Sequence, residues 1–354
     1  MQKRPRARIA GGERGPVSSS QSMSQSMSQS MSGSILVAGG AGYIGSHACK
    51  ALAAAGYSPV TLDNLVMGHA DAVKWGPLHE GDIRDEALVT ELVARYDIKG
   101  AIHFAAHSLI GESNRDPAKY YDNNLTAGVI FAKALADAGV APLVVSSTAS
   151  VYGAPEVSPI PESHPTRPIN PYGSTKLALE DALRWMEPAY GLNVTVLRYF
   201  NAAGADPDGE IGERHEPETH LVPLLCRAML GRAGPLTVFG DDYPTPDGTA
   251  VRDYVHVTDL ADAHVLALRR LIEGGRGDTY NVGAGQGASV LQLIKAAEAV
   301  AGRPAPYGFG PRREGDPPAL VADIGLIGRD LGWRPTRSLD AMIADAMRFE
   351  AARG

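Results

Sequence analysis

Cysteine is almost absent from this chain of 354 residues, which has only Cys49 and Cys226, far apart in the sequence. This excludes a disulfide framework and a cysteine-rich zinc cluster, and it favours two reduced thiols. No apolar run reaches the ~18 residues that a membrane-spanning helix needs. Basic residues are outnumbered as well, and the formal net charge is −7. A mildly acidic chain has no bulk attraction for nucleic acid or an anionic membrane, so we expect neither as a partner and take the cytoplasm as its location.

The first 33 residues differ from the rest of the chain. Residues 1–16 are basic and rich in glycine and proline, and residues 21–32 repeat the letters QSMS three times. A segment with so little to bury is expected to be a disordered, low-complexity tail over 1–33. It lacks the continuous apolar stretch of a secretory signal. Because Met31 stands just before the first predicted strand, we expect the working protein to begin near it.

From Ser34 onward, short β-branched runs alternate with helical patterns. This alternation is typical of a doubly wound parallel sheet that binds its ligand at the carboxyl ends of the strands. Beyond about residue 200, glycine, proline and aspartate become dense and the elements shorten. We therefore predict an α/β fold with a Rossmann-type doubly wound parallel sheet, mainly over 34–200. A smaller C-terminal substrate-binding lobe is predicted mainly over 201–354, with some chain crossing back to the sheet. The predicted strands are 34–38, 58–62, 100–104, 143–147 and 193–200, and the predicted helices are 43–55, 86–95, 117–138 and 172–188.

A glycine motif follows the first predicted strand. The letters GGAGYIG put Gly39, Gly42 and Gly45 at the mouth of the first helix. In a dinucleotide site the first glycine makes the turn, the second lets a pyrophosphate approach, and the third lets helix pack on strand. Asp63 ends the second strand, where a carboxylate accepts hydrogen bonds from ribose hydroxyls and repels a 2′-phosphate. Together these residues predict NAD, rather than NADP, as the cofactor.

Two further strand ends belong to the same edge of the sheet. In the letters GDI, Asp82 would accept a hydrogen bond from the adenine amino group and Ile83 would pack on its ring. In HFAA, the residues Phe104, Ala105 and Ala106 would line the pyrophosphate and nicotinamide side. Either segment alone is no more than a strand end, so both assignments depend on the glycine motif.

Tyr172 and Lys176 open a predicted helix in the letters YGSTK. Four residues apart on a helix, they share one face, so the ammonium can lie beside the phenol. A free tyrosine has a pKa of about 10, and nearby positive charge lowers it. Lowering the pKa to about 7, which takes roughly 4 kcal/mol, would make Tyr172 a base at neutral pH. Thr148 closes the fifth strand at the same edge, where it can bond the substrate hydroxyl that Tyr172 deprotonates.

These motifs stand in an order that resembles the UDP-glucose 4-epimerases, extended members of the short-chain dehydrogenase/reductase superfamily. The matching stretches run from Ser34 to the C-terminus and include GGAGYIGSH, LDNL, EGDIR, HFAA, YYDNN, SST, PYGSTK, RYFNAAGA, DDYPTPDGT, VRDYVHVTDLADAH, YNVGAG and PRREGD. The resemblance implies reversible epimerisation at C4 of a UDP-hexose, UDP-glucose or UDP-galactose. The family removes the 4-hydroxyl proton while the C4 hydride moves to bound NAD, and then returns hydride to the other face of the 4-keto sugar.

The resemblance also implies a role for each matching residue. Tyr172 corresponds to the catalytic base, Lys176 to its partner and nicotinamide-ribose ligand, and Thr148 to the hydroxyl helper. The implied substrate contacts, besides Thr148 and Tyr172, are Asn201, Arg252 and Arg313 at the diphosphate, Asp316 at the uridine ribose, Thr237 and Phe239 near uracil, and His220, Leu221 and Leu320. The further implied cofactor contacts are Tyr43, Ile44, Asn64, Asn123 and Tyr199.

Several positions depart from the family pattern. Thr148 stands where a serine is familiar, and because the hydroxyl is kept the chemistry is expected to survive. Ser108 stands where some members have a lysine near the cofactor, so that contact is not carried over. His220 and Leu221 stand where an Asn-Leu pair often contacts the nucleotide. Leu320 holds the place of a tyrosine found in members strict for hexoses without an N-acetyl group, which leaves substrate strictness open.

The resemblance further implies a homodimer. In the relatives the helix of about 117–138 and the helix opened by Tyr172 pair with their symmetry mates as a four-helix bundle. Modest local support comes from apolar positions beyond those that face the sheet, although ordinary core packing could use them too. These positions are Val129, Ile130, Leu135, Leu179 and Leu183.

Other functions are weighed against particular residues. A 4,6-dehydratase or a UDP-glucuronate decarboxylase on this fold needs an acid after the strand-end hydroxyl, whereas Thr148 is followed by Ala149 and Ser150. A 4-epimerase acting on UDP-xylose/UDP-arabinose or on a UDP-N-acetylhexosamine is the alternative left open. A non-catalytic NAD sensor is disfavoured because the Thr148, Tyr172 and Lys176 set is intact. The ten histidines suggest no metal site, so no metal is expected.

Overall fold

The computed structural model describes residues 1–2, 33–313 and 316–353. The predicted tail over 1–33 therefore lies outside the described residues, apart from Met1, Gln2 and Gly33. Among the helices that are described, none is both long enough and apolar enough to cross a membrane.

A parallel sheet of seven strands forms the centre of the structure, as the alternating pattern predicts. Its strand order is β3-β2-β1-β4-β5-β6-β10, and every neighbouring pair is parallel. The inner strands are apolar without alternation, because helices cover both faces of a parallel sheet; in β1, for example, Ile35, Leu36 and Val37 are fully buried. The strands are β1 Ser34–Ala38, β2 Ser58–Asp63, β3 Leu78–Glu80, β4 Ile98–His103, β5 Pro142–Thr148, β6 Asn193–Tyr199 and β10 Thr279–Val282.

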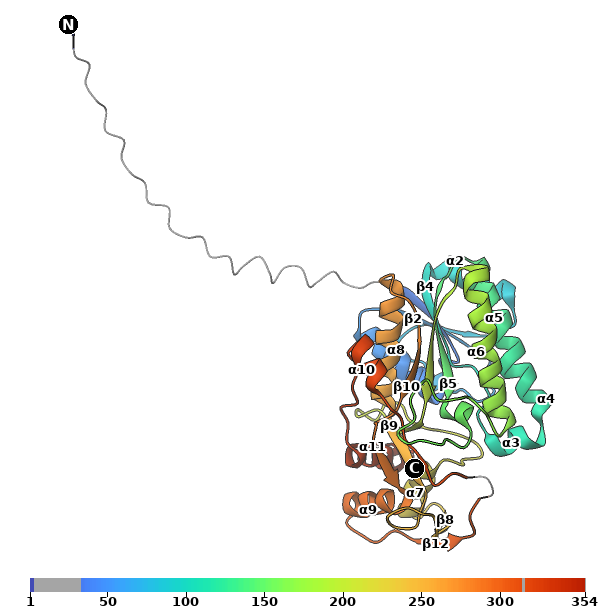
Figure 1. Ribbon diagram of the computed structural model, residues 1–354, viewed down its shortest axis with the longest axis vertical. Helices are drawn as coiled ribbons and strands as arrows, with labels where there is room; N and C mark the ends of the chain where they lie inside the picture. The colour runs from blue at the N-terminus through green and yellow to red at the C-terminus, as the bar shows by residue number, and fades with distance from the viewer. Residues whose placement is uncertain (3–32, 314–315, 354) are drawn as a thin grey trace. The chain divides into compact units, whose positions relative to one another are not determined.

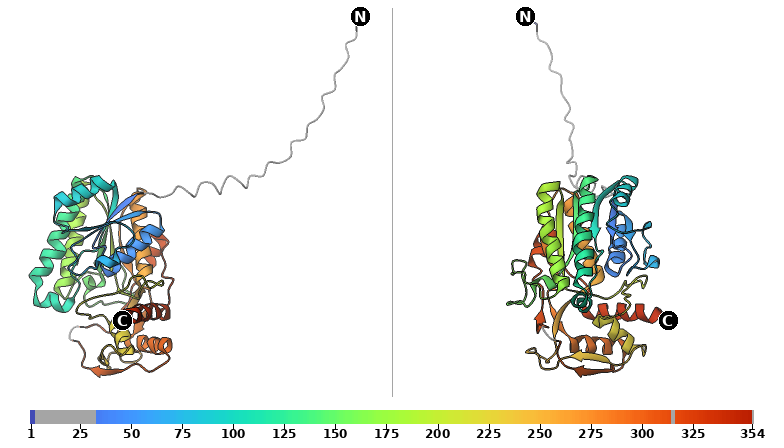
Figure 2. Two further views of the ribbon diagram at one scale, coloured as in Figure 1. Left: turned by 180° about the vertical axis from the view of Figure 1, so that it is seen from behind. Right: turned by 90° about the vertical axis from the view of Figure 1, so that its right-hand side faces the viewer.

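Helices cover the sheet on both sides (Figures 1 and 2). The helices α1 (Tyr43–Ala54) and α8 (Val257–Ile272) pack together on one face. The helices α2 (Glu86–Tyr96), α5 (Ala127–Asp137) and α6 (Pro171–Tyr190) bury their apolar sides on the other, in one core cluster with β1, β2, β4, β5 and β6. This is the Rossmann-type arrangement predicted from the sequence, and it brings the carboxyl ends of the strands to one edge.

Residues after the sixth strand build smaller sheets and a second core cluster. The strands β7 (Asn201–Ala203), β11 (Gly287–Ser289) and β13 (Ala319–Leu320) all pair with β9 (Val251–His256), and β8 (Leu236–Phe239) pairs with β12 (Tyr307–Gly310). The helices of this cluster are α7 Leu221–Met229, α9 Val290–Ala301 and α11 Leu339–Ala352. Two elements from the same half of the chain belong to the large sheet layer: β10 is its edge strand, and α8 packs on its face. The helix α10 (Gly325–Leu331) packs beside both. The division into two lobes near residue 200 stays a prediction.

The single helix predicted over 117–138 is wrong in detail. The segment consists of α4 (Pro117–Tyr120), a π-helical stretch (Tyr121–Thr126) and α5. Within the π-helical stretch Asn124 is buried, and its side chain bonds both backbone groups of His107, with N–O distances of 2.8 and 2.9 Å. The wider π turn thus coincides with an inward-facing polar side chain, a common cause of such bulges near functional sites. The remaining short elements are α3 Ile110–Arg115 and 3-10 turns at Ala70–Ala72 and Ala149–Tyr152.

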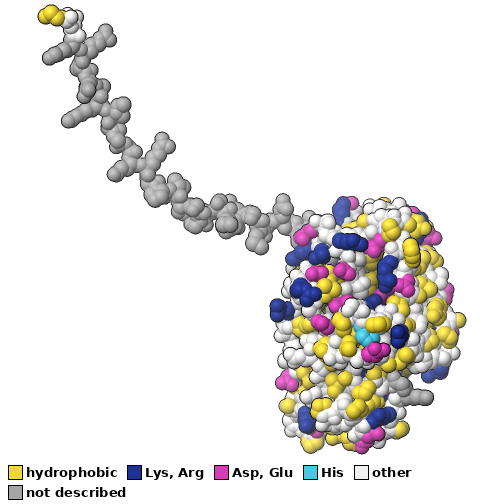
Figure 3. Space-filling model, viewed as in Figure 1, with side chains coloured by type: hydrophobic (Ala, Val, Ile, Leu, Met, Phe, Trp, Pro, Cys, Tyr) yellow, Lys and Arg dark blue, Asp and Glu magenta, His cyan; other side chains and the backbone are white. Residues whose placement is uncertain are grey.

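The surface shown in Figure 3 carries charges of both signs. Lys and Arg side chains are interspersed with Asp and Glu over the described residues of this face. That face therefore offers no continuous basic surface of the kind that nucleic acid binds.

Candidate active site

The glycine turn joins β1 to α1. Gly39 has φ +80°, and a Cβ placed there would lie 2.6 Å from the backbone nitrogen of Ala105. A Cβ on Gly45 would lie 2.1 Å from the Gly39 carbonyl oxygen, so these two positions require glycine. At Gly42 an added Cβ would be in ordinary contact with the Gly39 carbonyl oxygen, at 3.4 Å, so the turn does not itself require glycine there. The turn is therefore tightest at Gly39 and Gly45.

The first turn of α1 presents backbone N–H groups without a capping side chain. Gly42 is the N-cap, and Tyr43 and Ile44 are the first two helical residues. Orphan N–H groups and the helix dipole make such an end a site for anions, phosphates above all. The Tyr43 hydroxyl donates to the Gly204 carbonyl at 2.7 Å and so links this end of α1 to the segment that follows β7.

Asp63 lies at the end of β2 beside this turn. Its carboxylate accepts one hydrogen bond from the Ala41 N–H and one from the Leu65 N–H, both at 2.9 Å. Burial raises its pKa, although both hydrogen bonds oppose the shift. Each oxygen keeps a free lone pair that can accept from a hydroxyl. Asn64 is exposed, and its side-chain oxygen accepts from the Val66 N–H at 3.2 Å.

The other predicted cofactor residues follow β3 and β4. Asp82 pairs with Arg84 at 3.2 Å, while Ile83 is buried. Both Phe104 and Ala105 donate their N–H to the carbonyl of Ala38 in β1. These bonds hold the carboxyl ends of β1 and β4 together. Ala106 comes next on the chain and is half-buried, as are Phe104 and Ala105. The ring of Phe104 packs against His264, with 4.7 Å between centroids.

Asn123 is half-buried in the π-helical stretch, where its side chain donates to the neighbouring Asn124 at 3.0 Å. Asn124 makes the wider connections. Besides its bonds to His107 it donates to the Thr175 hydroxyl of α6 at 3.2 Å. The two asparagines thus connect the segment after β4 to the helix that carries Tyr172.

Thr148, Tyr172 and Lys176 come together at the carboxyl end of β5. Thr148 is the last residue of that strand, and its hydroxyl lies close enough to the phenol of Tyr172 to lower the pKa of that phenol in part. Tyr172 lies in the first turn of α6, whose N-cap Asn170 accepts from the Gly173 N–H at 2.8 Å. Lys176 is buried one turn later. The structure therefore brings the predicted catalytic residues into one place.

The contacts of Lys176 differ from the expected ones, and the lowered pKa of Tyr172 beside a nicotinamide ring stays a prediction. Burial raises the pKa of Tyr172, and the hydrogen bond from Thr148 lowers it only in part. Burial also lowers the pKa of Lys176 to about 8, against the pull of Glu180. The ammonium does not bond the phenol. It donates instead to Ser146, at 3.0 Å to the carbonyl and 3.1 Å to the hydroxyl.

Tyr199 and His264 form a buried pair behind this site that the sequence did not reveal. The Nδ1 of His264 lies 2.8 Å from the Leu260 carbonyl, so Nδ1 carries the proton. Nε2 is then an acceptor, and the Tyr199 hydroxyl donates to it. Burial lowers the pKa of His264 to about 4, which keeps the ring neutral. From the sequence, His264 was interpreted only as a packing residue of a helix. Its bond to the Leu260 carbonyl, one turn earlier, involves a backbone group and therefore leaves no pattern in the sequence.

Three predicted substrate residues line one pocket. Asn201, His220 and Leu221 border it together with Glu213 and Tyr254. The Nδ1 of His220 lies 2.9 Å from the Glu213 carboxylate. His220 is the N-cap of α7, so its neighbour Leu221 begins that helix. The pocket therefore lies between β7, β9 and the start of α7.

The predicted arginines occupy separate environments. Arg252 on β9 pairs with Asp316 at 2.5 Å. The guanidinium of Arg313 stacks over the ring of Phe239 at 4.3 Å, and Thr237 lies on the same strand, β8. Arg252 and Asp316 are thus brought together, as are Arg313 and Phe239.

Leu320 lies on β13, in register with Arg252 on β9. It is half-buried and packs against the cluster that contains Ala149, Val151 and Tyr152. Those residues form the 3-10 turn that Thr148 caps. Leu320 therefore connects the arginine strand to the turn that follows the catalytic hydroxyl.

Comparison with known proteins gives consistent relationships. A curated UDP-glucose 4-epimerase from Rhizobium meliloti (strain 1021) is 50% identical over 320 residues, which cover 90% of this chain and 98% of the relative. The solved structure of UDP-glucose 4-epimerase from Brucella ovis in complex with NAD has a TM-score of 0.88 and 48% identity. It covers 90% of this chain and 98% of its own.

A further solved structure carries a sugar nucleotide. It is a UDP-glucose 4-epimerase from Stenotrophomonas maltophila with bound NAD and formylated UDP-arabinopyranose, with a TM-score of 0.88 and 41% identity. It covers 90% of this chain and 98% of its own. The NAD dependent epimerase/dehydratase family matches residues 35–283. The Rossmann-type sheet, the glycine turn and the match over most of the chain agree, and the chain belongs to the NAD dependent epimerase/dehydratase family.

Proposed function

We propose that this protein is an NAD-dependent UDP-glucose 4-epimerase, which interconverts UDP-glucose and UDP-galactose. The observation that carries the proposal is the meeting of Thr148 and Tyr172 at the carboxyl end of β5, in a chain 50% identical to a protein of that activity. A sugar hydroxyl held between the Thr148 hydroxyl and the Tyr172 phenol can exchange its proton with the phenol.

The residues around the glycine turn fit NAD. Gly42 is the N-cap of α1 and brings no side chain to an uncapped helix end, which suits a pyrophosphate. Asp63 is held by two backbone N–H groups with lone pairs to spare for ribose hydroxyls, and its negative charge opposes a 2′-phosphate. When bound, NAD supplies the acceptor for the hydrogen at C4 and a positive charge near Tyr172. The other proposed cofactor contacts are Gly39, Tyr43, Ile44, Gly45, Asn64, Asp82, Ile83, Phe104, Ala105, Ala106, Asn123, Lys176 and Tyr199.

Tyr172 is the proposed general base and acid. It takes the proton of the 4-hydroxyl in one direction and returns it in the other, while Thr148 orients that hydroxyl. Because burial holds the phenol neutral before ligands bind, the proton-accepting form depends on charge brought to the site. Lys176, with a pKa of about 8, is poised to add or withdraw a positive charge near neutral pH.

The substrate diphosphate is proposed to bind where guanidinium and amide groups gather. Arg252 and Arg313 suit phosphate oxygens because each offers a planar fork of donors. Arg252 is held by Asp316 in the ligand-free structure, so the pair must open or share its donors when a diphosphate binds. The other proposed substrate contacts are Asn201, His220, Leu221, Thr237, Phe239 and Leu320.

A second candidate is epimerisation of UDP-N-acetylhexosamines or of UDP-xylose/UDP-arabinose. The observation that favours the N-acetyl substrate is Leu320, which packs against the cluster of Ala149, Val151, Tyr152, Ile160, Phe200 and Ala322. Leucine is smaller than the tyrosine of strict hexose enzymes. The pentose substrate draws support from the Stenotrophomonas maltophila relative, whose structure contains formylated UDP-arabinopyranose.

We also propose a homodimer in the cytoplasm. Trp185 on α6 is 80% exposed, which favours a protein partner for the outer surface of that helix. Cys49 and Cys226 are both free and buried, which fits a reducing compartment.

The test is turnover of UDP-galactose by the purified full chain with no added reductant, and separation of the products. UDP-glucose should form, because the hydrogen removed from C4 is returned in the same cycle. A panel with UDP-xylose and UDP-N-acetylglucosamine then ranks the substrates. Absence of any UDP-glucose, with NAD present in the protein, would overturn the proposal.

A further inference from the structure

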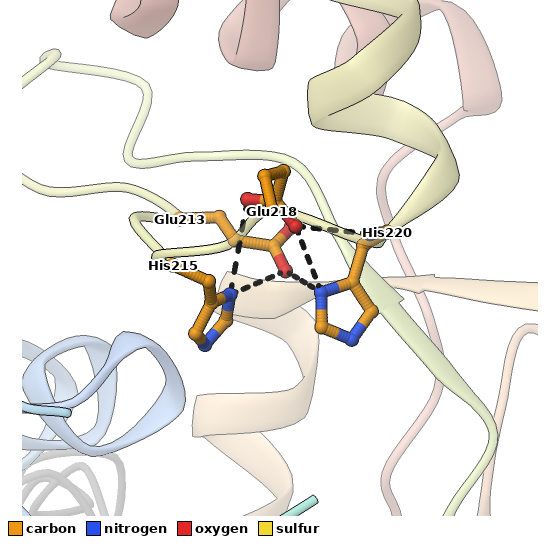
Figure 4. A group of neighbouring side chains, drawn as sticks. All are labelled: Glu213, His215, Glu218 and His220. Carbon is orange, nitrogen blue, oxygen red and sulfur yellow. Dashed lines mark hydrogen bonds and ion pairs between the residues drawn. The ribbon is translucent and has the colours of Figure 1, made fainter. Parts of the chain in front are cut away.

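Two histidines and two glutamates converge in the irregular segment between β7 and α7 (Figure 4). They are Glu213, His215, Glu218 and His220, and Figure 4 shows both imidazoles turned toward the two carboxylates. The Nδ1 of His220 lies 2.9 Å from Glu213 and 3.1 Å from Glu218. The Nδ1 of His215 lies 3.3 Å from Glu213 and 3.9 Å from Glu218. Four potential ligand atoms therefore surround one point.

The carboxylates of this cluster are buried beside the two imidazoles. The exposed fraction of the side chain is 1% for Glu218 and 6% for Glu213. The nearest guanidinium to Glu218, that of Arg227, stays 3.9 Å away and lies closer to Glu350, at 3.3 Å. Although burial opposes the shift, the two carboxylates raise the pKa of His220 to about 10. A divalent cation would take the place of the imidazole proton, because only the neutral ring is a metal ligand.

Two atoms aimed into the cluster have no hydrogen-bond partner. They are the Oε2 of Glu218 and the Nδ1 of His215, and both are buried. The other oxygen of Glu218 is fully used, since it accepts from the N–H groups of Thr219 and His220 at 2.8 and 2.9 Å. Buried polar atoms are nearly always paired, so these two point to a ligand that the protein chain itself does not provide.

The separations match those of a metal coordination shell. All four ligand atoms lie within 4.8 Å of one another. For bonds of ~2.0–2.1 Å, the edge of a tetrahedron is roughly 3.3–3.4 Å. The Glu213 Oε1 lies 2.9 and 3.3 Å from the two Nδ1 atoms, and the Glu218 Oε2 lies 3.9 Å from the Nδ1 of His215, so these separations lie on both sides of that value. A mixed imidazole and carboxylate set suits Zn²⁺ and its neighbours, whereas Ca²⁺ and Mg²⁺ prefer oxygen alone.

We propose that Glu213, His215, Glu218 and His220 bind a divalent transition-metal ion of the Zn²⁺ class. Glu213 and His220 also line the pocket that contains Asn201, so the ion would fix one wall of that pocket. No metal site was predicted from the sequence, because the spacings of two, three and two residues do not place all four ligands on one face of a helix or strand. Only the irregular path of the chain before α7 brings them together.

A second acidic cluster provides a contrast. Asp206, Asp208 and Glu210 also gather within ligand distance of one another. Their cation is already present, because the Lys50 ammonium lies 2.9, 2.8 and 2.7 Å from the three carboxylates. This cluster needs no metal ion, and its residues serve as controls.

The experiment titrates the full chain, purified without an affinity tag and stripped with a chelator, with Co²⁺ and then Zn²⁺. We expect saturable binding of one ion per chain, a visible absorption band of tetrahedral Co²⁺ that Zn²⁺ displaces, and a rise in Tm with Zn²⁺. His215→Ala should weaken Zn²⁺ binding at least ~100-fold, since loss of an outer-shell partner alone costs up to that much. Asp208→Asn should bind Zn²⁺ as the wild type does.

Failure to bind one ion per chain, or unchanged Zn²⁺ affinity in His215→Ala, would overturn the proposal. If His215→Ala does not fold, judged by its melting transition, His215→Gln takes its place. The wild-type titration decides the question in either case, because it needs no variant. None of these measurements depends on epimerase activity, so the metal site and the proposed function can fail separately.

Discussion

At the residue scale, burial shifts the pKa of both proposed proton-transfer residues. It raises the pKa of Tyr172 and lowers that of Lys176 to about 8. The Lys176 ammonium donates to the carbonyl and the hydroxyl of Ser146. Because a buried phenolate costs free energy, Tyr172 needs further positive charge nearby to act as a base, and bound NAD would supply it.

Replacing Tyr172 by phenylalanine removes the proton acceptor and keeps the ring. We expect Tyr172→Phe to fold and bind NAD normally while kcat falls by about 10²–10⁴ or more, the usual contribution of a general base. Activity is measured by product separation and NAD content by absorbance after denaturation. Tyr121→Phe, at an exposed tyrosine, is the matched control and should keep full activity. Near-normal turnover by Tyr172→Phe would rule out the proposed base.

Leu320 should set how strictly the pocket excludes an N-acetyl group. It packs against a cluster that includes residues of the turn capped by Thr148, which supports a place near the reacting end of the site. We expect the wild type to epimerise UDP-N-acetylglucosamine detectably, more slowly than UDP-glucose. Leu320→Tyr should lower the N-acetyl activity by about 10–200-fold, the ~1–3 kcal/mol typical of steric discrimination, and spare the hexose reaction.

Assays of both nucleotides on both proteins decide that prediction. Leu320→Val, which keeps the pocket open, is the control and should retain the N-acetyl activity. A wild type wholly inert on UDP-N-acetylglucosamine, or a tyrosine variant equally active on both nucleotides, would assign strictness to another residue.

The residues that could be predicted from the sequence are those fixed by regular elements. Thr148 closes a strand and Tyr172 opens a helix, so one strand end and one helix turn suffice to bring them together. The Tyr199 and His264 pair and the cluster around Glu218 could not be predicted. The first joins a strand to a distant helix, and the second depends on an irregular loop.

At the element scale, alternating strands and helices predicted the parallel sheet and the bounds of five of its strands, but not those of the short β3 or of β10, which comes from the second half of the chain. The runs of buried residues in β1, β4 and β5 are long enough to identify strands without help from the rest of the chain. The same reasoning missed the π-helical stretch at Tyr121–Thr126, because its cause is a tertiary contact. Asn124 turns inward to bond His107 and Thr175, and no helical period anticipates those partners.

The strand-to-helix turn at Gly45 gives an element-scale prediction. A methyl group there would lie 2.1 Å from the Gly39 carbonyl oxygen, so α1 must move away from the turn. We expect Gly45→Ala to destabilise the protein by ~1–3 kcal/mol, as overpacking does, and to reduce the NAD that copurifies. Thermal melts and NAD content measure the two effects.

Gly111→Ala is the matched control for that change. Gly111 lies in α3, and an added Cβ there meets nothing within 4 Å. Stability should be unchanged or slightly higher, because alanine is the better helix former. If Gly45→Ala melted and bound NAD like Gly111→Ala, the tight turn would not be needed for the cofactor site.

At the scale of the whole molecule, the outer surface of α5 and α6 decides whether two chains associate. Three of the apolar positions first assigned to a dimer contact, Leu135, Leu179 and Leu183, are instead buried in the chain's own core. Val129 and Ile130 on α5 remain half-buried. Part of the expected interface is therefore used for packing on the sheet. The spacing of apolar residues along a helix does not distinguish a surface that faces the core from one that faces a second chain.

The helix α6 exposes two aromatic side chains that were not among the apolar positions predicted for the dimer contact. Trp185 is 80% exposed, and Tyr190, five residues later at the end of α6, is 49% exposed. The ammonium of Lys133 from α5 lies 5.0 Å from the centre of the Tyr190 ring. The two helices thus share an outer surface with aromatic side chains. Tryptophan and tyrosine exposed in this way are typical centres of protein interfaces.

We expect the wild type to be a dimer by sedimentation equilibrium across micromolar concentrations, and Trp185→Glu to shift it to monomer. A carboxylate at the centre of an apolar contact would face its symmetry mate across the two-fold axis, and both charges would lose water. Phe309→Glu is the control, because Phe309 is a similarly exposed aromatic, 51% exposed, on β12 of the smaller sheets. That variant should remain dimeric. A monomeric wild type would end the dimer proposal, and a dimeric Trp185→Glu protein would remove α6 from its interface.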